Sequence, residues 1–281
     1  MNSEHDKYSI ENTDYSVGQD NIRKWGFDIH NPVFGVSAGL ILLFLIATLA
    51  TDSATAKKLL DGLKWDIIGN FDALFMWAGN IFVVFCLLLI VSPYGKLRLG
   101  GKDAKPKHST ISWLAMLFAA GMGIGLMFWS VAEPVAYLTG GYETPLGVEA
   151  NTPEAARMAM GATMYHWGLH PWAIYAVVGL SLAFFTYNKG LPLSIRSIFY
   201  PILGDRTWGW PGHIIDILAV LATLFGLATS LGLGAQQAAA GINHVFGIEN
   251  GIGLQILVII VVTALAVISV VRGLEGGVKL L

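Results

Sequence analysis

Long apolar stretches recur along the chain and are separated by shorter polar connections. A helix needs about 20 mostly apolar residues to cross the hydrocarbon core of a bilayer. Six stretches meet this requirement and are predicted to be membrane spans: residues 32–50, 72–92, 111–132, 159–186, 212–236 and 252–271. The pattern therefore predicts an all-α polytopic membrane protein with its transmembrane domain over residues 31–281.

The connections differ in their content of basic residues. Thirteen of the 17 Lys and Arg residues lie before the first span, in 93–110, in 187–211 or after the last span. Because Lys and Arg are enriched on the cytoplasmic side, residues 1–30 are predicted to be a cytoplasmic polar tail, retained and partly disordered. Lys57, Lys58 and Lys64 in the first connection oppose this orientation. Residues 133–158, with four Glu and only Arg157 as a basic residue, suit an external loop.

Composition narrows the possible functions. The chain is 54% hydrophobic and 13% charged, whereas soluble domains contain about 25% charged residues, and its mean hydropathy is +0.61. The composition therefore argues against a water-soluble fold. The net charge of −2 offers no basic surface to neutralise phosphates, which argues against nucleic-acid binding. The spans contain no nucleophile, base or metal cluster typical of an intramembrane enzyme.

Three glycines alternate within the third predicted span, at Gly121, Gly123 and Gly125. Each weakens a regular helix by about 1 kcal/mol relative to alanine, so the span could be broken, with freed carbonyls that coordinate a cation. Gly121 and Gly125 are also four residues apart, the spacing of a close helix-packing face. The glycine run alone favours packing over a broken helix.

The fourth predicted span is rich in aromatic residues. On a continuous helix, at about 100° per residue, Trp167, Tyr175 and Trp172 fall near 0°, 80° and 140° and share one broad face. Aromatic faces attract quaternary ammonium groups, so these rings are candidates for one wall of a cation site. An interfacial aromatic belt is the equal alternative. Pro171 is expected to kink this span.

Further polar side chains lie at membrane depth. His166 and His170 are four residues apart, but no third ligand accompanies them, so we expect hydrogen-bonded structural histidines or part of a proton path rather than a metal site. Thr223 in the fifth span offers a hydroxyl to a cation such as sodium. Bonding of that hydroxyl back to its own helix is the commoner situation.

Three ordered motifs, taken together, resemble the betaine/carnitine/choline transporter (BCCT) family. They are the run 121–128 followed by Glu133-Pro134, the run 166–175, and the stretch from Leu191 through Asp216 to Gly234. The resemblance covers nearly everything after residue 30. It implies an ion-coupled secondary transporter (a symporter) in the bacterial inner membrane that takes up quaternary-ammonium osmolytes such as glycine betaine or choline for osmoprotection. The coupling ion would be Na⁺ or H⁺, with no other cofactor.

The resemblance also implies an architecture and a site. A full-length member would have twelve spans, with a core of two inverted five-helix repeats, and would form a homotrimer; this chain corresponds to its first half. The substrate-binding residues implied are Trp167, Trp172 and Tyr175. The ion-binding residues implied are Ala119 and Met122, through their carbonyls, and Thr223.

Two departures from the family pattern matter. Leu227 stands where sodium-coupled betaine members can have a second threonine, which weakens one sodium site and leaves proton coupling open. The chain also stops just after the sixth predicted span, before the family's tryptophan-rich eighth span. We therefore expect that these 281 residues do not transport alone, and the alternative function is a non-transporting fragment that needs a separate C-terminal half.

Overall fold

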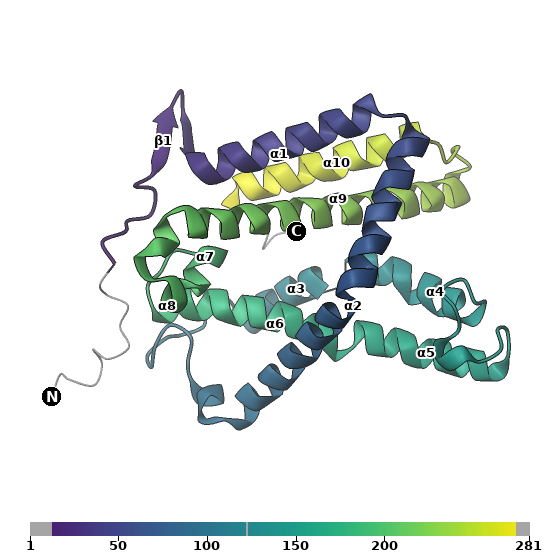
Figure 1. Cartoon of the computed structure of the whole chain (residues 1–281), viewed down its shortest axis with the longest axis horizontal. Helices are drawn as coiled ribbons and strands as arrows, with labels where there is room; N and C mark the ends of the chain where they lie inside the picture. Colours follow the sequence, from purple (N-terminus) through teal and green to yellow (C-terminus); the bar gives the residue numbers. More distant parts are fainter. Residues whose placement is uncertain (1–12, 122, 274–281) are drawn as a thin grey trace. The chain divides into compact units, whose positions relative to one another are not determined.

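The structure, a computed structural model, describes residues 13–121 and 123–273 and is mainly helical (Figure 1). Within those residues, five helical stretches are long and apolar enough to cross a membrane: Asn31–Ala50, Ser53–Val91, Pro153–Asn188, Trp210–Phe246 and Ile252–Val271. The stretch Pro153–Asn188 joins two helices, Pro153–Trp167 and Leu169–Ala183, that adjoin at Gly168. The prediction of an all-α polytopic membrane protein is confirmed. The third predicted span is missing from this set because it is divided into two shorter helices.

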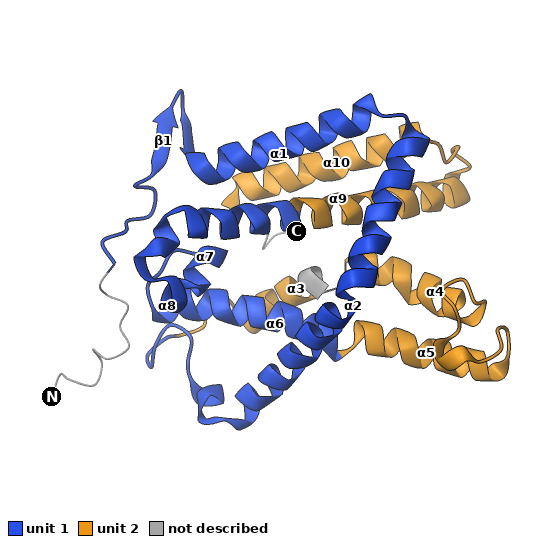
Figure 2. Cartoon of the chain, viewed as in Figure 1, with its two compact units in different colours: residues 1–104, 169–223 blue, residues 105–168, 224–281 orange. Residues whose placement is uncertain are grey.

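Two compact units make up the chain, coloured separately in Figure 2. The first unit comprises residues 1–104 and 169–223, and the second comprises residues 105–168 and 224–281. Within the first unit lie β1 (Asn21–Lys24), β2 (Phe27–His30), α1 (Asn31–Ala50), α2 (Ser53–Val91), α6 (Leu169–Ala183), α7 (Ile195–Ile198), α8 (Tyr200–Leu203) and the start of α9 (Trp210–Phe246). Within the second lie α3 (Thr110–Gly121), α4 (Ile124–Leu138), α5 (Pro153–Trp167), the rest of α9, and α10 (Ile252–Val271).

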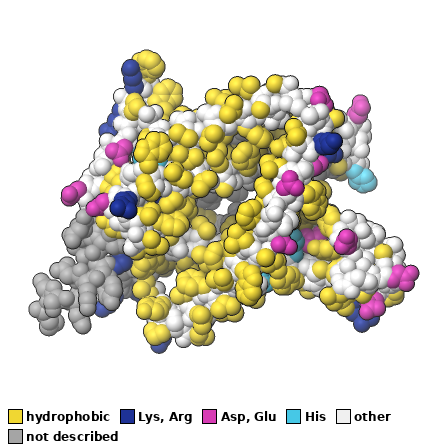
Figure 3. All heavy atoms as spheres, viewed as in Figure 1, with side chains coloured by type: hydrophobic (Ala, Val, Ile, Leu, Met, Phe, Trp, Pro, Cys, Tyr) yellow, Lys and Arg dark blue, Asp and Glu magenta, His cyan; other side chains and the backbone are white. Residues whose placement is uncertain are grey.

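The helices α1 and α10 match their predicted spans closely. Helix α1 begins one residue earlier than predicted, and α10 has the predicted bounds. Both are apolar around their whole circumference, as expected for helices surrounded by lipid. Figure 3 accordingly shows hydrophobic side chains over much of the visible helical surface.

The helix α2 is much longer than the span predicted within it. It begins at Ser53, 19 residues before the predicted start at residue 72, and continues to Val91. Asp52 caps it, because its side chain accepts a hydrogen bond of 2.9 Å from the Thr55 backbone N–H. Further along, α2 packs against α6, where His170 Nε2 lies 3.0 Å from Asn80 Oδ1.

Residues 21–30 form a β-hairpin that the sequence analysis did not predict. The strands β1 and β2 pair antiparallel, with Asn21 opposite His30 and Lys24 opposite Phe27. Trp25 and Gly26 form the turn with φ of 53° and 82°, which is the left-handed geometry that suits the twist of a two-residue hairpin. Part of the polar tail is therefore regular structure.

Candidate functional site

The third predicted span is interrupted at its glycine run. Helix α3 ends at Gly121 and α4 begins at Ile124, with Gly123 in an extended conformation (φ −73°, ψ 172°) at the N-cap. A Cβ added at Gly123 or Gly125 would meet no described atom within 4 Å. Gly125, one of the two residues of the expected packing face, therefore has no close neighbour at its Cβ position among the described residues. The broken helix is the arrangement observed.

This interruption exposes backbone polar groups. The last carbonyls of α3 and the first N–H groups of α4 lack partners within their own helices. Within a membrane, such groups are tolerated only where protein or water shields them. Discontinuous helices of this kind supply carbonyls and helix termini to solute and ion sites in transporters. The first candidate groups of the site are therefore backbone carbonyls and N–H groups rather than side chains.

Helix α5 lies alongside α4 within the second unit (Figure 1). The positions Ala155, Ala159 and Thr163 recur every four residues on α5, and their exposed fractions are 0%, 1% and 9%. Their small side chains allow another helix to approach closely. Thr163 also satisfies its own hydroxyl, which donates to the Ala159 carbonyl at 2.9 Å. The next position in this series is Trp167, the last residue of α5.

Glu133 on α4 makes two contacts with the end of α5. The Trp167 indole Nε1–H donates to Glu133 Oε2 at 2.7 Å, and His166 Nδ1 lies 2.7 Å from Glu133 Oε1. The Glu133 residue is only 2% exposed. Assignment of this residue to an external loop was wrong, because α4 continues to Leu138. Had the span been extended past residue 132, a glutamate inside it would have signalled a functional site.

The aromatic span is also interrupted, at Gly168. Helix α5 ends at Trp167, Gly168 has φ −80° and ψ −125°, and α6 begins at Leu169. A Cβ at Gly168 would lie 2.6 Å from the Met164 carbonyl oxygen. The break therefore occurs at Gly168, and Pro171 lies in the first turn of α6, where a missing N–H costs little.

This break changes the predicted aromatic wall. The shared face of three rings assumed one continuous helix, and that assumption was wrong. Trp172 and Tyr175 remain together on α6, with ring centroids 5.7 Å apart and planes inclined by 33°. Trp167 belongs to the second unit with Glu133. The binding roles of these three residues stay predictions.

Two of the three predicted ion-binding residues lie within the described residues, on different helices. Ala119 lies in α3, and Met122 lies outside the described residues. Thr223 is exposed on α9, and its hydroxyl donates to the Ala219 carbonyl at 2.8 Å. This bond back to the helix is the alternative noted for that hydroxyl. The ion site also stays a prediction.

The two histidines of the aromatic span have separate polar partners. His166 contacts Glu133, and His170 contacts Asn80. Their interpretation as hydrogen-bonded histidines is confirmed. Among residues 13–121 and 123–273, no cluster of three or more His, Cys, Asp or Glu is suited to hold a metal ion.

A second buried charge, Arg196, lies in the first unit and was not singled out as a site. Arg196 is 6% exposed, and its Nε lies 3.0 Å from Asp216 Oδ2. This is an ion-pair distance, although the N–H is not directed at an acceptor as a hydrogen bond requires. The Arg196 backbone N–H does donate to Asp216 Oδ1 at 3.0 Å. The guanidinium also lies 5.7 Å from the ring centroids of Tyr15 and Trp208, which stack at 4.2 Å.

The N-terminal segment reaches this cluster through Tyr15 and His30. Arg196 Nη2 lies 3.5 Å from the Tyr15 hydroxyl and 3.5 Å from His30 Nε2. Burial, and then the Arg196 charge, lowers the pKa of His30. Burial raises the pKa of Tyr15, with Arg196 opposing that shift. The cluster therefore fastens the hairpin segment to the connection before α9.

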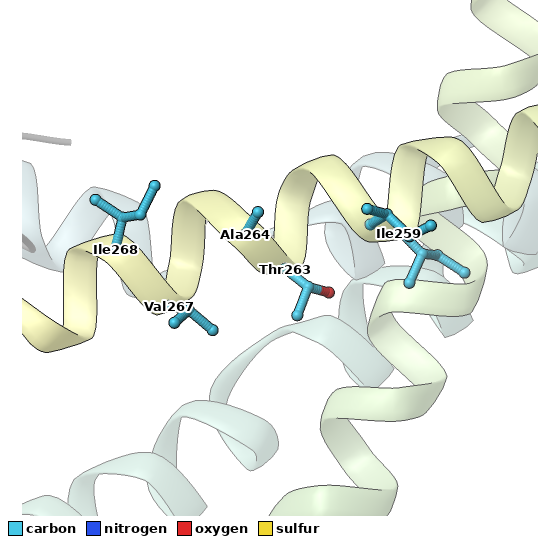
Figure 4. Close-up of a pocket in the computed structure, with 6 residues that line it drawn as sticks. Ile259, Thr263, Ala264, Val267 and Ile268 are labelled. Carbon is cyan, nitrogen blue, oxygen red and sulfur yellow. The ribbon is translucent and has the colours of Figure 1, made fainter.

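A hollow of about 600 Å³ runs along α10 (Figure 4). Of the part of the chain that the structure describes, α10 alone lines it, through Ile259, Ile260, Thr263, Ala264, Val267 and Ile268. Thr263 contributes the single side-chain hydroxyl of that lining. A binding site for a polar solute needs several polar groups that converge on it. This apolar surface is therefore not the candidate site.

Comparison with known proteins places these features in a family. Residues 32–281 match the family model described as BCCT, the betaine/carnitine/choline family transporters. The chain is 79% identical to glycine betaine transporter 1 of Vibrio parahaemolyticus over 276 residues, which are 98% of the chain and 53% of that relative. It is 66% identical to a glycine betaine/proline/choline/ectoine transporter of the same organism over 100% of the chain and 50% of that relative.

A more distant relative gives the same picture. The high-affinity choline transport protein of Escherichia coli is 42% identical over 252 residues, which are 89% of the chain and 36% of that relative. The chain spans about half the length, or less, of these curated relatives. The family match covers nearly the whole chain after the polar tail. The chain therefore belongs to the betaine/carnitine/choline transporter family, which comprises membrane transporters rather than enzymes.

Proposed function

We propose that the chain forms the first half of a secondary active transporter that takes up quaternary-ammonium osmolytes such as glycine betaine or choline. The observation that carries this proposal is the interruption of the α3–α4 span at Gly123, which has an extended conformation. A break at membrane depth is costly unless it lines a solute or ion pathway. Relatives named as betaine and choline transporters support the choice of substrate.

The aromatic residues suit the chemistry of this substrate class. A trimethylammonium group has no N–H to donate, so hydrogen-bond acceptors recognise it poorly. Ring faces attract it by about 2 kcal/mol or more where water is excluded. Trp172 and Tyr175 form a ring pair, and Trp167 is held by a hydrogen bond. These three residues are the proposed substrate contacts.

Several finer features belong to the same proposal. The protein resides in the bacterial inner membrane, with the N-terminus in the cytoplasm, as the distribution of Lys and Arg favours. A gradient of Na⁺ or H⁺ drives uptake, and Ala119, Met122 and Thr223 contribute to ion binding. The full-length assembly is a homotrimer with two inverted five-helix repeats in each subunit.

Replacement of Trp167 by leucine tests the substrate role. In the full-length protein, Trp167→Leu is expected to raise the apparent KM for glycine betaine by about 30-fold, as the loss of about 2 kcal/mol implies. Uptake of radiolabelled betaine, with and without sodium, measures it and also distinguishes the coupling ions. Trp65→Leu is the matched control, because Trp65 is 63% exposed on α2. Unchanged affinity in Trp167→Leu would favour the interfacial-belt interpretation.

The alternative function is a half-transporter that needs a separate C-terminal half. The chain matches about half the length of each of two relatives. Reconstitution of the 281-residue chain in liposomes separates the two functions. We expect no betaine accumulation above that of empty vesicles, because the broken α3–α4 span would lack the protein that shields it. Accumulation by the isolated chain would contradict this expectation.

A further inference from the structure

We propose that Glu133 is a positioning residue that holds the Trp167 ring in the orientation required to bind an onium solute. This inference rests on the proposed function of the protein. It concerns three residues of the second unit, namely Glu133 on α4 with His166 and Trp167 at the end of α5. Glu133 does not touch the solute in this proposal; it acts through the indole.

The geometry fixes the indole at a defined point. Trp167 ends α5, and the backbone leaves the helical conformation at Gly168 immediately after it. A terminal helical residue is only partly restrained by its own helix. The 2.7 Å hydrogen bond from the indole Nε1–H to Glu133 Oε2 restrains the ring from the neighbouring helix. The ring of Trp167 is half-buried, which leaves part of its surface accessible.

The second carboxylate oxygen is also occupied. His166 Nδ1 lies 2.7 Å from Glu133 Oε1. Because an ionised carboxylate can only accept, Nδ1 carries a proton and donates to it. The His166 side chain is 65% exposed, whereas that of Glu133 is 3% exposed. Each oxygen therefore has one donor, and both donors come from consecutive residues. This arrangement prevents the carboxylate from rotating away from the indole.

The burial of Glu133 argues against a purely structural role. A carboxylate removed from water loses several kcal/mol of solvation, and a well-packed apolar residue often stabilises a fold as much or more. The α4–α5 contact already has a close-packed apolar stripe in Ala155 and Ala159. A glutamate at this position is therefore better explained by its effect on the two side chains that donate to it, His166 and Trp167.

The hydrogen bond also changes the electronic character of the ring. An indole N–H that donates to an anion is polarised toward that anion, as in other charge-assisted hydrogen bonds. Electron density on the ring face increases, and this face attracts a cation. Glu133 therefore strengthens binding of a charged head group more than binding of a neutral group with the same shape.

The test uses Glu133→Gln in the full-length protein. Glutamine keeps the size of the side chain and can still accept from the indole, but it removes the negative charge. Competition against labelled betaine is measured with choline and with its uncharged analogue 3,3-dimethylbutan-1-ol. We expect the affinity for choline to fall about tenfold, in line with the strength of a hydrogen bond to a charged group, while the affinity for the neutral analogue changes less than twofold.

Two further variants complete the experiment. Trp167→Phe keeps an aromatic face but removes the N–H that Glu133 holds, so adding Glu133→Gln to it is expected to cause little further loss. Glu149→Gln is the matched control, because Glu149 is exposed in the connection between α4 and α5. The indole ¹⁵N–H resonance that disappears in Trp167→Phe should shift in Glu133→Gln and stay fixed in Glu149→Gln.

Each outcome bears on a different claim. Equal losses for choline and the neutral analogue would overturn the electronic effect of Glu133 on the ring, and additive losses in the double variant would overturn its positioning role. An unshifted indole resonance would overturn it independently of transport. If the unmodified full-length protein bound no onium solute, the proposed function itself would fail. The indole resonance would still report whether Glu133 holds Trp167.

Discussion

The two units of the chain each bury a charged side chain, and they stabilise it differently. Glu133 is 2% exposed and Arg196 is 6% exposed. Arg196 has an oppositely charged partner in Asp216 and two aromatic rings beside its guanidinium. Glu133 has two donors that carry no fixed charge, the titratable imidazole of His166 and the neutral indole of Trp167. Trp167 is a residue proposed to bind the solute.

This difference indicates that Arg196 stabilises the fold, as an anchor between segments, whereas Glu133 affects solute binding. The contacts of Arg196 join residues far apart in the sequence, from Tyr15 to Asp216, so its charge is used to fasten segments together. The contacts of Glu133 converge on two consecutive residues at the end of one helix. Loss of Arg196 should therefore reduce stability first, whereas loss of the Glu133 charge should reduce solute affinity first.

The largest effect on stability is expected from Arg196→Met. This change leaves the Asp216 carboxylate, whose side chain is 13% exposed, without its cation. Breaking one side of a buried ion pair costs about 3–5 kcal/mol. Thermal unfolding of the detergent-solubilised protein measures the loss. Protein that remains folded should keep its affinity for betaine, in contrast to Glu133→Gln.

Two controls sharpen this prediction. Arg206→Met removes a basic residue that is exposed in the same connection and should leave the unfolding temperature nearly unchanged. Arg196→Met combined with Asp216→Asn removes both charges and should recover part of the stability. Equal destabilisation by Arg196→Met and Arg206→Met would show that the cluster is not an anchor.

A smaller effect is expected from Gly168→Ala at the end of the helix that carries Trp167. The new Cβ would lie 2.6 Å from the Met164 carbonyl oxygen, so the break must shift, at a cost of about 1–3 kcal/mol. Because Trp167 adjoins Gly168, betaine affinity should fall as well. Gly161→Ala is the control, since its Cβ would meet no described atom within 4 Å; that change should be neutral or slightly stabilising.

The smallest effect is a pH dependence at the anchor. The pKa of His30 is lowered in the folded protein by burial and by Arg196. The unfolded state then binds more protons below about pH 6.5, so stability from this contact is present above that pH and is lost as pH falls. His213 faces His30, with ring centroids 5.2 Å apart, and the carboxylates of Asp20 and Asp216 partly oppose the shift.

Hydrogen exchange in the hairpin measures this dependence. Amides of Asn21–Lys24 and Phe27–His30 should exchange faster at pH 5.5 than at pH 7.5, after correction for the intrinsic rate. His30→Gln should remove most of the difference. A hairpin equally protected at both values would mean that His30 does not couple to Arg196.

Sequence patterns predicted the membrane helices best where every turn is apolar. Helices α1 and α10 follow their predicted bounds because uninterrupted apolar runs leave no alternative to a span. The predicted span within α2 was too short. The Lys and Asp residues in the first half of the helix lower its hydropathy, so hydropathy alone does not show that the helix extends through them. The Trp25-Gly26 turn was missed because tryptophan rarely adopts a positive φ.

The site was less predictable because it depends on contacts between distant residues. The glycine run indicated either a break or close packing, and only tertiary structure decides between them. A kink was expected at Pro171, but the break lies at Gly168, where the neighbouring Met164 carbonyl leaves no space for a Cβ. The hydrogen bond between Trp167 and Glu133 spans 34 residues, and no periodicity along the chain encodes it.

The length of α2 has a consequence for how the chain occupies a bilayer. Its 39 residues form a rod about 58 Å long, nearly twice the thickness of the hydrocarbon core, which is about 30 Å. Hiding the whole rod would require a tilt of about 60°, whereas membrane helices tilt by at most about 40°. At least a third of α2 must therefore project into the headgroup layer or the water beyond, where the amines of Lys57, Lys58 and Lys64 remain hydrated.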